Sequence, residues 1–194
     1  MAPTERRDTP FPRLLPGLLT VGGALGLIAA FVLAVEKIAL LKDPAYVPTC
    51  SINPILSCGS VMITPQAEVF GFPNPLLGIA SFAVVTTVGA VLMAGVSLPR
   101  WFWLGLQAGV TFGVVFVHWL IYQSLYVIGA LCPYCMVVWA VTIPLFGYVT
   151  LHNLRHRPAA WRIAGYHTVI LTVWFLTLVT LIGVRFWSYW STLI

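Results

Sequence analysis

The chain has 194 residues, of which 60% are hydrophobic and only 8% are charged, against about 25% charged residues in ordinary soluble domains. Mean hydropathy is +0.96, so the polar residues are too few to cover the surface of a soluble domain of this size. The composition excludes a soluble globular enzyme, a disordered chain and a nucleic-acid-binding protein, and the net charge of +5 has to be explained at a membrane.

Five apolar stretches are long enough to cross a bilayer, for which a helix needs roughly 20 residues. All five are predicted to be helices, because lipid offers no water to satisfy backbone polar groups. A Pro-rich loop at residues 42–74 follows the first stretch and is the only long loop predicted. We therefore expect an all-α integral membrane protein. The five predicted spans cover about residues 15–41, 75–96, 101–126, 132–151 and 165–187.

Lys and Arg residues are distributed unevenly between the two sides of these spans, and cytoplasmic loops carry the excess. A cytoplasmic N-terminus puts seven inside and three outside. The bias predicts a multi-pass protein of the cell membrane, with a cytoplasmic tail at residues 1–14 and the 42–74 loop and C-terminus outside. Residues 152–194 then hold an inner basic loop and the fifth helix. The inner residues are Arg6, Arg7, Arg13, Arg100, Arg155, Arg157 and Arg162, and the outer ones are Lys37, Lys42 and Arg185.

All four cysteines lie on the predicted outer side, where disulfides persist. Cys50 and Cys58 belong to the outer loop, whereas Cys132 and Cys135 form a Cys-Pro-Tyr-Cys motif where the fourth helix begins. Residues i and i+3 share a helix face, and a helix N-terminus lowers the pKa of a cysteine. The motif therefore indicates a redox-active pair. Two structural disulfides and a four-cysteine zinc site remain alternatives, while haem attachment requires a histidine where Met136 stands.

The sequence around the cysteines resembles the vitamin K epoxide reductase family, most of all its bacterial members. The resemblance spans about residues 15–151 and implies a four-helix bundle around a quinone site, here followed by a fifth helix. Several bacterial members carry a thioredoxin-like domain after their fifth helix. This sequence stops at Ile194, so we expect a separate thioredoxin-like or DsbA-like partner outside the cell. The residues that carry the resemblance are Cys50–Met62 (CSINPILSCGSVM), Asn74–Gly78 (NPLLG) and Cys132–Cys135 (CPYC).

The same resemblance implies a role for each cysteine. Cys135 would react with a membrane quinone, either menaquinone or ubiquinone, and Cys132 would be its disulfide partner. Cys50 would meet the external redox partner, and Cys58 would exchange with Cys132.

Two further residues are implied to bind the quinone. Asn74 matches an asparagine that hydrogen-bonds a quinone carbonyl, although it could also cap the second helix with Pro75 at the first helical position. Trp139 stands where animal members carry a quinone-binding tyrosine, and an indole N–H can also donate a hydrogen bond.

Other polar residues fall within the predicted spans. His118 and Tyr122 lie one helical turn apart in the third helix, and an ionisable residue inside a membrane suggests a function. We hypothesise that they deliver protons to the quinone site; the alternative is a histidine bonded to a neighbouring helix. Glu36 and Lys37 lie near the outer end of the first helix, and Lys37 is expected to extend towards the interface.

The expected function is a quinone-dependent thiol–disulfide oxidoreductase that supports disulfide bond formation, with no metal site. Reduction of vitamin K epoxide as the main activity is one alternative. A non-enzymatic membrane protein with structural disulfides is the other.

Overall fold

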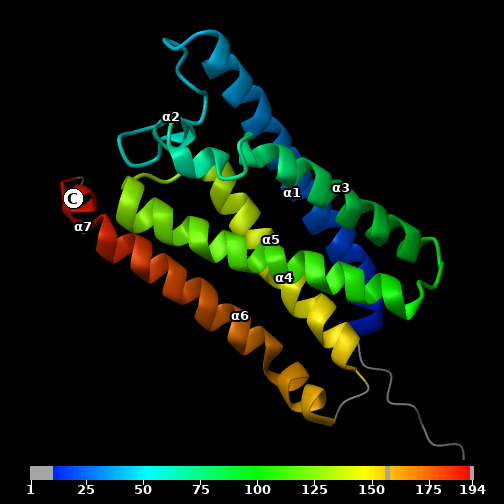
Figure 1. Cartoon of the computed structure of the whole chain (residues 1–194). Helices are drawn as coiled ribbons and strands as arrows, with labels where there is room; N and C mark the ends of the chain where they lie inside the picture. The colour runs from blue at the N-terminus through cyan, green and yellow to red at the C-terminus, as the bar shows by residue number, and fades with distance from the viewer. Residues whose placement is uncertain (1–10, 156–157, 193–194) are drawn as a thin grey trace, which may run out of the picture.

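The computed structural model describes residues 11–155 and 158–192, with side chains described over 14–155 and 165–192. Five of its helices are long and apolar enough to cross a membrane, which confirms the predicted all-α membrane fold (Figure 1). The predicted tail at residues 1–14 falls mostly outside the described residues, and the first helix already begins at Phe11. The five are α1 (Phe11–Lys42), α3 (Asn74–Met93), α4 (Arg100–Tyr122), α5 (Pro133–Leu154) and α6 (Pro158–Arg185).

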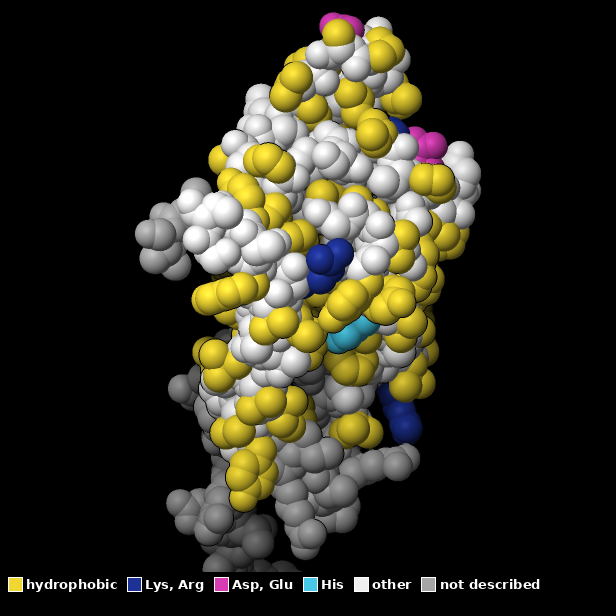
Figure 2. All heavy atoms as spheres, turned by 90° about the vertical axis from the view of Figure 1, so that its left-hand side faces the viewer, with side chains coloured by type: hydrophobic (Ala, Val, Ile, Leu, Met, Phe, Trp, Pro, Cys, Tyr) yellow, Lys and Arg dark blue, Asp and Glu magenta, His cyan; other side chains and the backbone are white. Residues whose placement is uncertain are grey.

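Four of these helices form a bundle, in which α1 packs against α3 and α5, and α4 packs against α5. The fifth, α6, lies along the outside of the bundle beside α5 (Figure 1). One face of the molecule is covered mostly by hydrophobic side chains, and its acidic groups lie only towards the end that carries the outer loop (Figure 2). This distribution is the one expected of helices surrounded by lipid.

Glycines allow the close approach of α1 to α3, as small residues commonly do between membrane helices. A Cβ added at Gly23 would lie 2.8 Å from the backbone nitrogen of Thr86, and one at Gly26 would lie 2.5 Å from the ring of Phe82. Neither position has room for a side chain, so substitution at Gly23 would force the two helices apart.

The outer loop contains more regular structure than the sequence predicts. Residues 42–74 include a short helix, α2 (Cys58–Met62), and a 3₁₀ turn, η1 (Pro65–Glu68). The α2 helix begins after Ser57, whose side chain accepts a hydrogen bond from the Ser60 backbone N–H, as N-cap serines do. The predicted Pro-rich loop thus contains two short helical segments.

The connection from α4 to α5 is also unusual. The α4 helix continues directly into a π-helical turn, η2 (Gln123–Ile128), a form that occurs often at functional sites. Gly129 ends this turn with φ of +71°, a backbone conformation that favours glycine. After α6, the chain closes with a short helix, α7 (Trp187–Trp190). The outer loop, η2 and α7 all gather at one end of the bundle (Figure 1).

Candidate functional site

The four cysteines meet at this end of the bundle. Cys50 and Cys58 form a disulfide, whereas Cys132 and Cys135 are free thiols. The Sγ atom of Cys58 lies 3.1 Å from the Sγ atom of Cys132. Cys50, Cys58 and Cys132 are all buried. The spacing places a disulfide directly against a thiol, which is the arrangement that thiol–disulfide exchange requires.

A short backbone bridge holds Cys58 beside Cys132. Leu56 and Leu131 pair as an isolated parallel bridge. The Leu131 N–H donates to the Ile55 carbonyl at 2.7 Å, and the Ser57 N–H donates to the Leu131 carbonyl at 2.9 Å. Because each cysteine follows its bridge residue by one or two positions, the register of this bridge fixes the approach of the two sulfur atoms.

The Cys-Pro-Tyr-Cys motif sits at the start of α5, as the sequence predicts. Cys132 occupies the N-cap position with extended backbone, and Pro133 is in the first turn. The pKa of Cys132 is lowered, first by a hydrogen bond from the Cys135 thiol and then by the backbone N–H groups of Cys135 and Tyr134, while burial opposes the shift. The motif therefore favours a thiolate at Cys132, the sulfur that faces Cys58.

Removing Cys135 is expected to raise the pKa of Cys132, because the hydrogen bond that stabilises its thiolate is lost. In a Cys50→Ser/Cys58→Ser background, Cys135→Ala should move the midpoint of Cys132 alkylation by iodoacetamide to higher pH. Mass spectrometry of the Cys132 peptide across a pH series measures this midpoint. The exposed Val137→Ala change serves as the control and should leave the midpoint unchanged; an identical midpoint in the Cys135→Ala protein contradicts the assignment.

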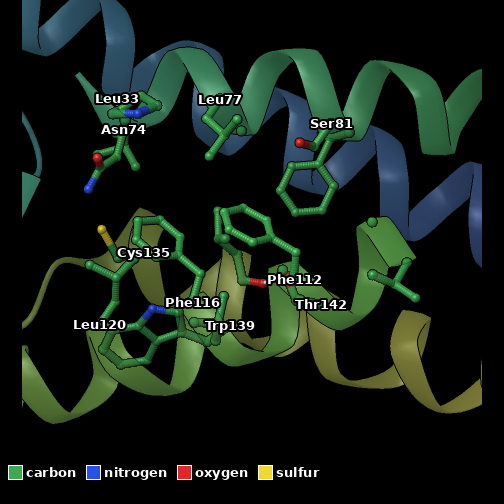
Figure 3. Close-up of a pocket in the computed structure, with 18 of the residues that line it drawn as sticks. Leu33, Asn74, Leu77, Ser81, Phe112, Phe116, Leu120, Cys135, Trp139 and Thr142 are labelled. Atoms are coloured by element: carbon green, nitrogen blue, oxygen red, sulfur yellow. Dashed lines mark hydrogen bonds between the residues drawn. The ribbon is translucent and has the colours of Figure 1, made fainter. Parts of the chain in front are cut away.

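A cavity of about 530 Å³ opens beside Cys135, within the range that holds small ligands. It runs between α3, α4 and α5, and its walls are almost entirely apolar (Figure 3). Asn74 and Cys135 point towards each other across its outer end (Figure 3). The cavity is thus an apolar site with a few polar groups gathered at the end that carries the thiols.

Asn74 is fixed in place by the outer loop. Its side-chain nitrogen donates to the Gln66 carbonyl at 2.7 Å, and its oxygen accepts from the Val69 N–H at 3.2 Å. These partners precede α3, and α3 itself begins at Asn74 with Pro73 in the N-cap position. Helix capping by Asn74 is therefore wrong, because the folded loop engages the side chain instead. Asn74 also lines the cavity, and within the described residues the Gln66 carbonyl is the one acceptor of its amide N–H groups.

Trp139 forms part of the cavity wall and is only 1% exposed. Its indole nitrogen lies on the side of the ring nearest Cys135 (Figure 3). Within the described residues the Trp139 indole N–H donates no hydrogen bond, and no fully enclosed side-chain donor there lacks a partner. The N–H is therefore reached from the cavity, where it is suited to donate to a bound molecule.

His118 and Tyr122 do not line the cavity. The Nε2 atom of His118 accepts a hydrogen bond from the Trp174 indole of α6 at 2.9 Å, and its Nδ1 atom lies 2.7 Å from the Val114 carbonyl. Tyr122 is 56% exposed. Both side chains point away from the bundle interior, so the structure separates them from the site and joins the histidine to a neighbouring helix.

Lys37 is a site residue that the sequence interpretation missed. It is only 7% exposed, lines the cavity, donates to the Met62 carbonyl at 2.7 Å and pairs with Glu68 at 2.7 Å. The expected extension to the interface is wrong, because the outer loop folds back and supplies these partners. The sequence signal for a buried role of Lys37 was its position next to Glu36 within a predicted membrane span.

The preceding residue, Glu36, binds the part of the outer loop that comes before Cys50. It is 6% exposed and accepts hydrogen bonds from the Tyr46 hydroxyl at 2.9 Å and from the Thr49 backbone N–H and hydroxyl. Glu36 and Lys37 therefore attach the segments before and after the Cys50–Cys58 disulfide to the same turn of α1.

The sulfur atoms of Cys50, Cys58 and Cys132 lie within 4.8 Å of one another, close enough for a shared metal ion. Two of them are joined in a disulfide, however, and zinc binds thiolates. The pairing also leaves Cys132 and Cys135 as free thiols rather than as a second structural bridge. Among the described residues, the arrangement therefore favours disulfide exchange.

Comparison with protein families gives a match to the vitamin K epoxide reductase family over residues 17–150, well over half of the chain. The matched segment runs from α1 into α5 and includes all four cysteines together with Asn74 and Trp139. The α6 helix lies beyond it. The chain therefore belongs to the vitamin K epoxide reductase family and is an oxidoreductase of a membrane.

Proposed function

We propose that this protein passes electrons from a reduced thioredoxin-like protein outside the cell to a membrane quinone, and so supports disulfide bond formation. Electrons would travel through Cys50 and Cys58 to Cys132 and Cys135. The observation that carries the proposal is the 3.1 Å approach of the Cys58 and Cys132 sulfur atoms, with Cys135 on the wall of the apolar cavity.

Two disulfide exchanges move one electron pair through the chain. A thiolate of the partner attacks Cys50 and breaks its bond to Cys58, and the second partner thiol then completes the partner's own disulfide. The Cys58 thiolate attacks Cys132 of an oxidised Cys132–Cys135 pair and releases the Cys135 thiolate. Cys50 then attacks Cys58, which re-forms the loop disulfide and leaves Cys132 and Cys135 reduced. The observed pairing, with a loop disulfide and two free thiols, matches this last stage.

Oxidation of Cys132 and Cys135 to their disulfide would release two electrons and two protons, which a quinone held in the cavity would take up and carry away as quinol. The apolar cavity is suited to a quinone ring with its hydrocarbon tail, and the indole N–H of Trp139 and the side-chain amide of Asn74 on its wall are donors suited to the carbonyl oxygens of the ring. Both menaquinone and ubiquinone satisfy this donor arrangement.

The partner has to reach Cys50, which is only 5% exposed. The outer loop must therefore move away from α1 before the first exchange and return before the second. Glu36 and Lys37 hold the returned position, in which Cys58 meets Cys132. Their hydrogen bonds and ion pair support a role for Glu36 and Lys37 in controlling the sequence of exchanges.

The proposed orientation puts the N-terminus in the cytoplasm and the cysteines and C-terminus outside the cell membrane. The seven-to-three distribution of Lys and Arg supports it, as does the meeting of the Cys50–Cys58 disulfide with the Cys-Pro-Tyr-Cys motif at one end of the bundle.

The experiment is an assay of quinone reduction by membranes that contain the protein, with dithiothreitol as the reductant. We expect quinol formation that depends on the protein, with menaquinone and ubiquinone compared in parallel. Vitamin K epoxide is supplied as a third acceptor; faster turnover with the epoxide would favour epoxide reduction as the main activity. No turnover with any of the three acceptors would contradict the proposal.

A further inference from the structure

The α6 helix lies beyond the family match, and none of its most apolar 18-residue window is buried within the protein. It nevertheless makes specific contacts with α4 and η2. The Trp174 indole donates to His118 at 2.9 Å, the Arg185 Nε donates to the Leu125 carbonyl at 2.8 Å, and Phe186 is 5% exposed. One face of α6 therefore packs on the bundle through Trp174, Leu178 and Ile182, and the contacts of Arg185 and Phe186 lie at its outer end.

The Arg185 side chain donates to the Leu125 carbonyl, which receives no hydrogen bond from the backbone N–H groups that follow η2. Leu125 is fully buried and lies in the π-helical turn η2. The turn closes through the Gly129 N–H and the Ser124 carbonyl, and neither Gly129 nor Ala130 donates to Leu125. Carbonyls at a helix end need an outside partner, and a charged donor makes a stronger hydrogen bond than a neutral one.

Phe186, the residue that follows Arg185, packs near Leu125 as well. It belongs to one buried cluster with Leu125, Leu131 and Trp139. Leu131 carries the backbone bridge that brings Cys132 to Cys58, and Trp139 forms the cavity wall. The outer end of α6 therefore packs directly behind the two elements that define the site.

We propose that Arg185 and Phe186 are positioning residues for electron transfer: the outer end of α6 holds η2 and Leu131 in the register that places Cys132 against Cys58. The inference rests on the proposed function, because the contact it explains is the exchange step. This proposal gives α6 a role in the geometry of the exchange site, in addition to the four helices that match the family.

The test isolates the contact between the two sulfur atoms. A Cys50→Ala/Cys135→Ala background leaves only Cys58 and Cys132, which form a disulfide by reducing oxidised glutathione to two reduced glutathiones. The equilibrium constant of this reaction, measured by alkylation and mass spectrometry, gives the effective concentration of one thiol at the other. We expect Arg185→Met and Phe186→Ala each to lower it by at least about tenfold, since small displacements have large effects on such reactions.

Two controls separate positioning from general damage. Arg185→Lys keeps a charged donor and should retain the constant to within about threefold, and Trp187→Ala, which removes an aromatic residue that is 63% exposed, to within about twofold. Melting temperatures of all variants identify any that fail to fold. A constant unchanged in both folded Arg185→Met and Phe186→Ala proteins overturns the inference, while absence of quinone reduction in the unaltered protein overturns the proposed function instead.

Discussion

Replacing Cys135 by alanine is expected to lower quinone reduction by at least about 10³-fold, the scale seen when a reacting nucleophile is removed. Cys135 is a free thiol on the cavity wall and faces Asn74 across the outer end of the cavity (Figure 3). Without it, the pair can neither donate two electrons nor re-form its disulfide. The measurement is quinol formation by membranes containing equal amounts of each protein, with dithiothreitol as the reductant.

The matched control for this prediction is Val137→Ala, two residues along the same helix, where the side chain is 38% exposed. It should leave turnover unchanged. A Cys135→Ala protein that reduces quinone as fast as the unaltered one contradicts the assignment of the reacting thiol.

The Cys58→Ala change is expected to stop turnover driven by a thioredoxin-like partner, with a loss of at least about 10²-fold. A thiolate of the partner attacks Cys50 only when Cys50 is part of a disulfide. In the Cys58→Ala protein Cys50 is a free thiol, so this attack cannot occur. A partner with a single active-site cysteine, supplied as its mixed disulfide with glutathione, should instead form a mixed disulfide with Cys50 and release glutathione. Neither Cys58 nor a second partner thiol is then present to resolve this adduct. Non-reducing electrophoresis detects the adduct.

The Cys50→Ala/Cys58→Ala protein is the control for this trap and should give no adduct through the loop. An adduct that maps to Cys132 in the Cys58→Ala protein would contradict the proposed order of exchange. Full partner-driven turnover without Cys58 would contradict it equally.

Much of the architecture follows from composition and spacing alone. Apolar stretches of about 20 residues permit little other than membrane helices, and the closely packed Gly23 and Gly26 are local features of one such stretch. The Cys-Pro-Tyr-Cys motif also predicts its own position, because a proline after an N-cap cysteine is compatible with the first helical turn. These features depend on neighbouring residues in the sequence.

The details of the site depend instead on contacts between distant segments. The sequence does not reveal that Leu131 pairs with Leu56, and this bridge decides which sulfur atoms meet. Nor does it reveal that the outer loop folds back onto α1, where Met62 and Glu68 bind the Lys37 ammonium group and keep it buried. For His118 the sequence suggested a role at the quinone site, because the residue is ionisable and lies in a membrane helix. In the structure its imidazole lies away from the cavity and accepts a hydrogen bond from the Trp174 indole of the neighbouring helix.

The central claim is that Cys132 and Cys135 reduce quinone directly, and a single turnover of the Cys50→Ala/Cys58→Ala protein tests it most directly. The protein is reduced, freed of reductant and mixed with excess quinone. The account predicts one quinol per chain, with a Cys132–Cys135 disulfide forming at the same rate. Quinol formation without this disulfide, or no quinol from fully reduced and folded protein, would contradict it.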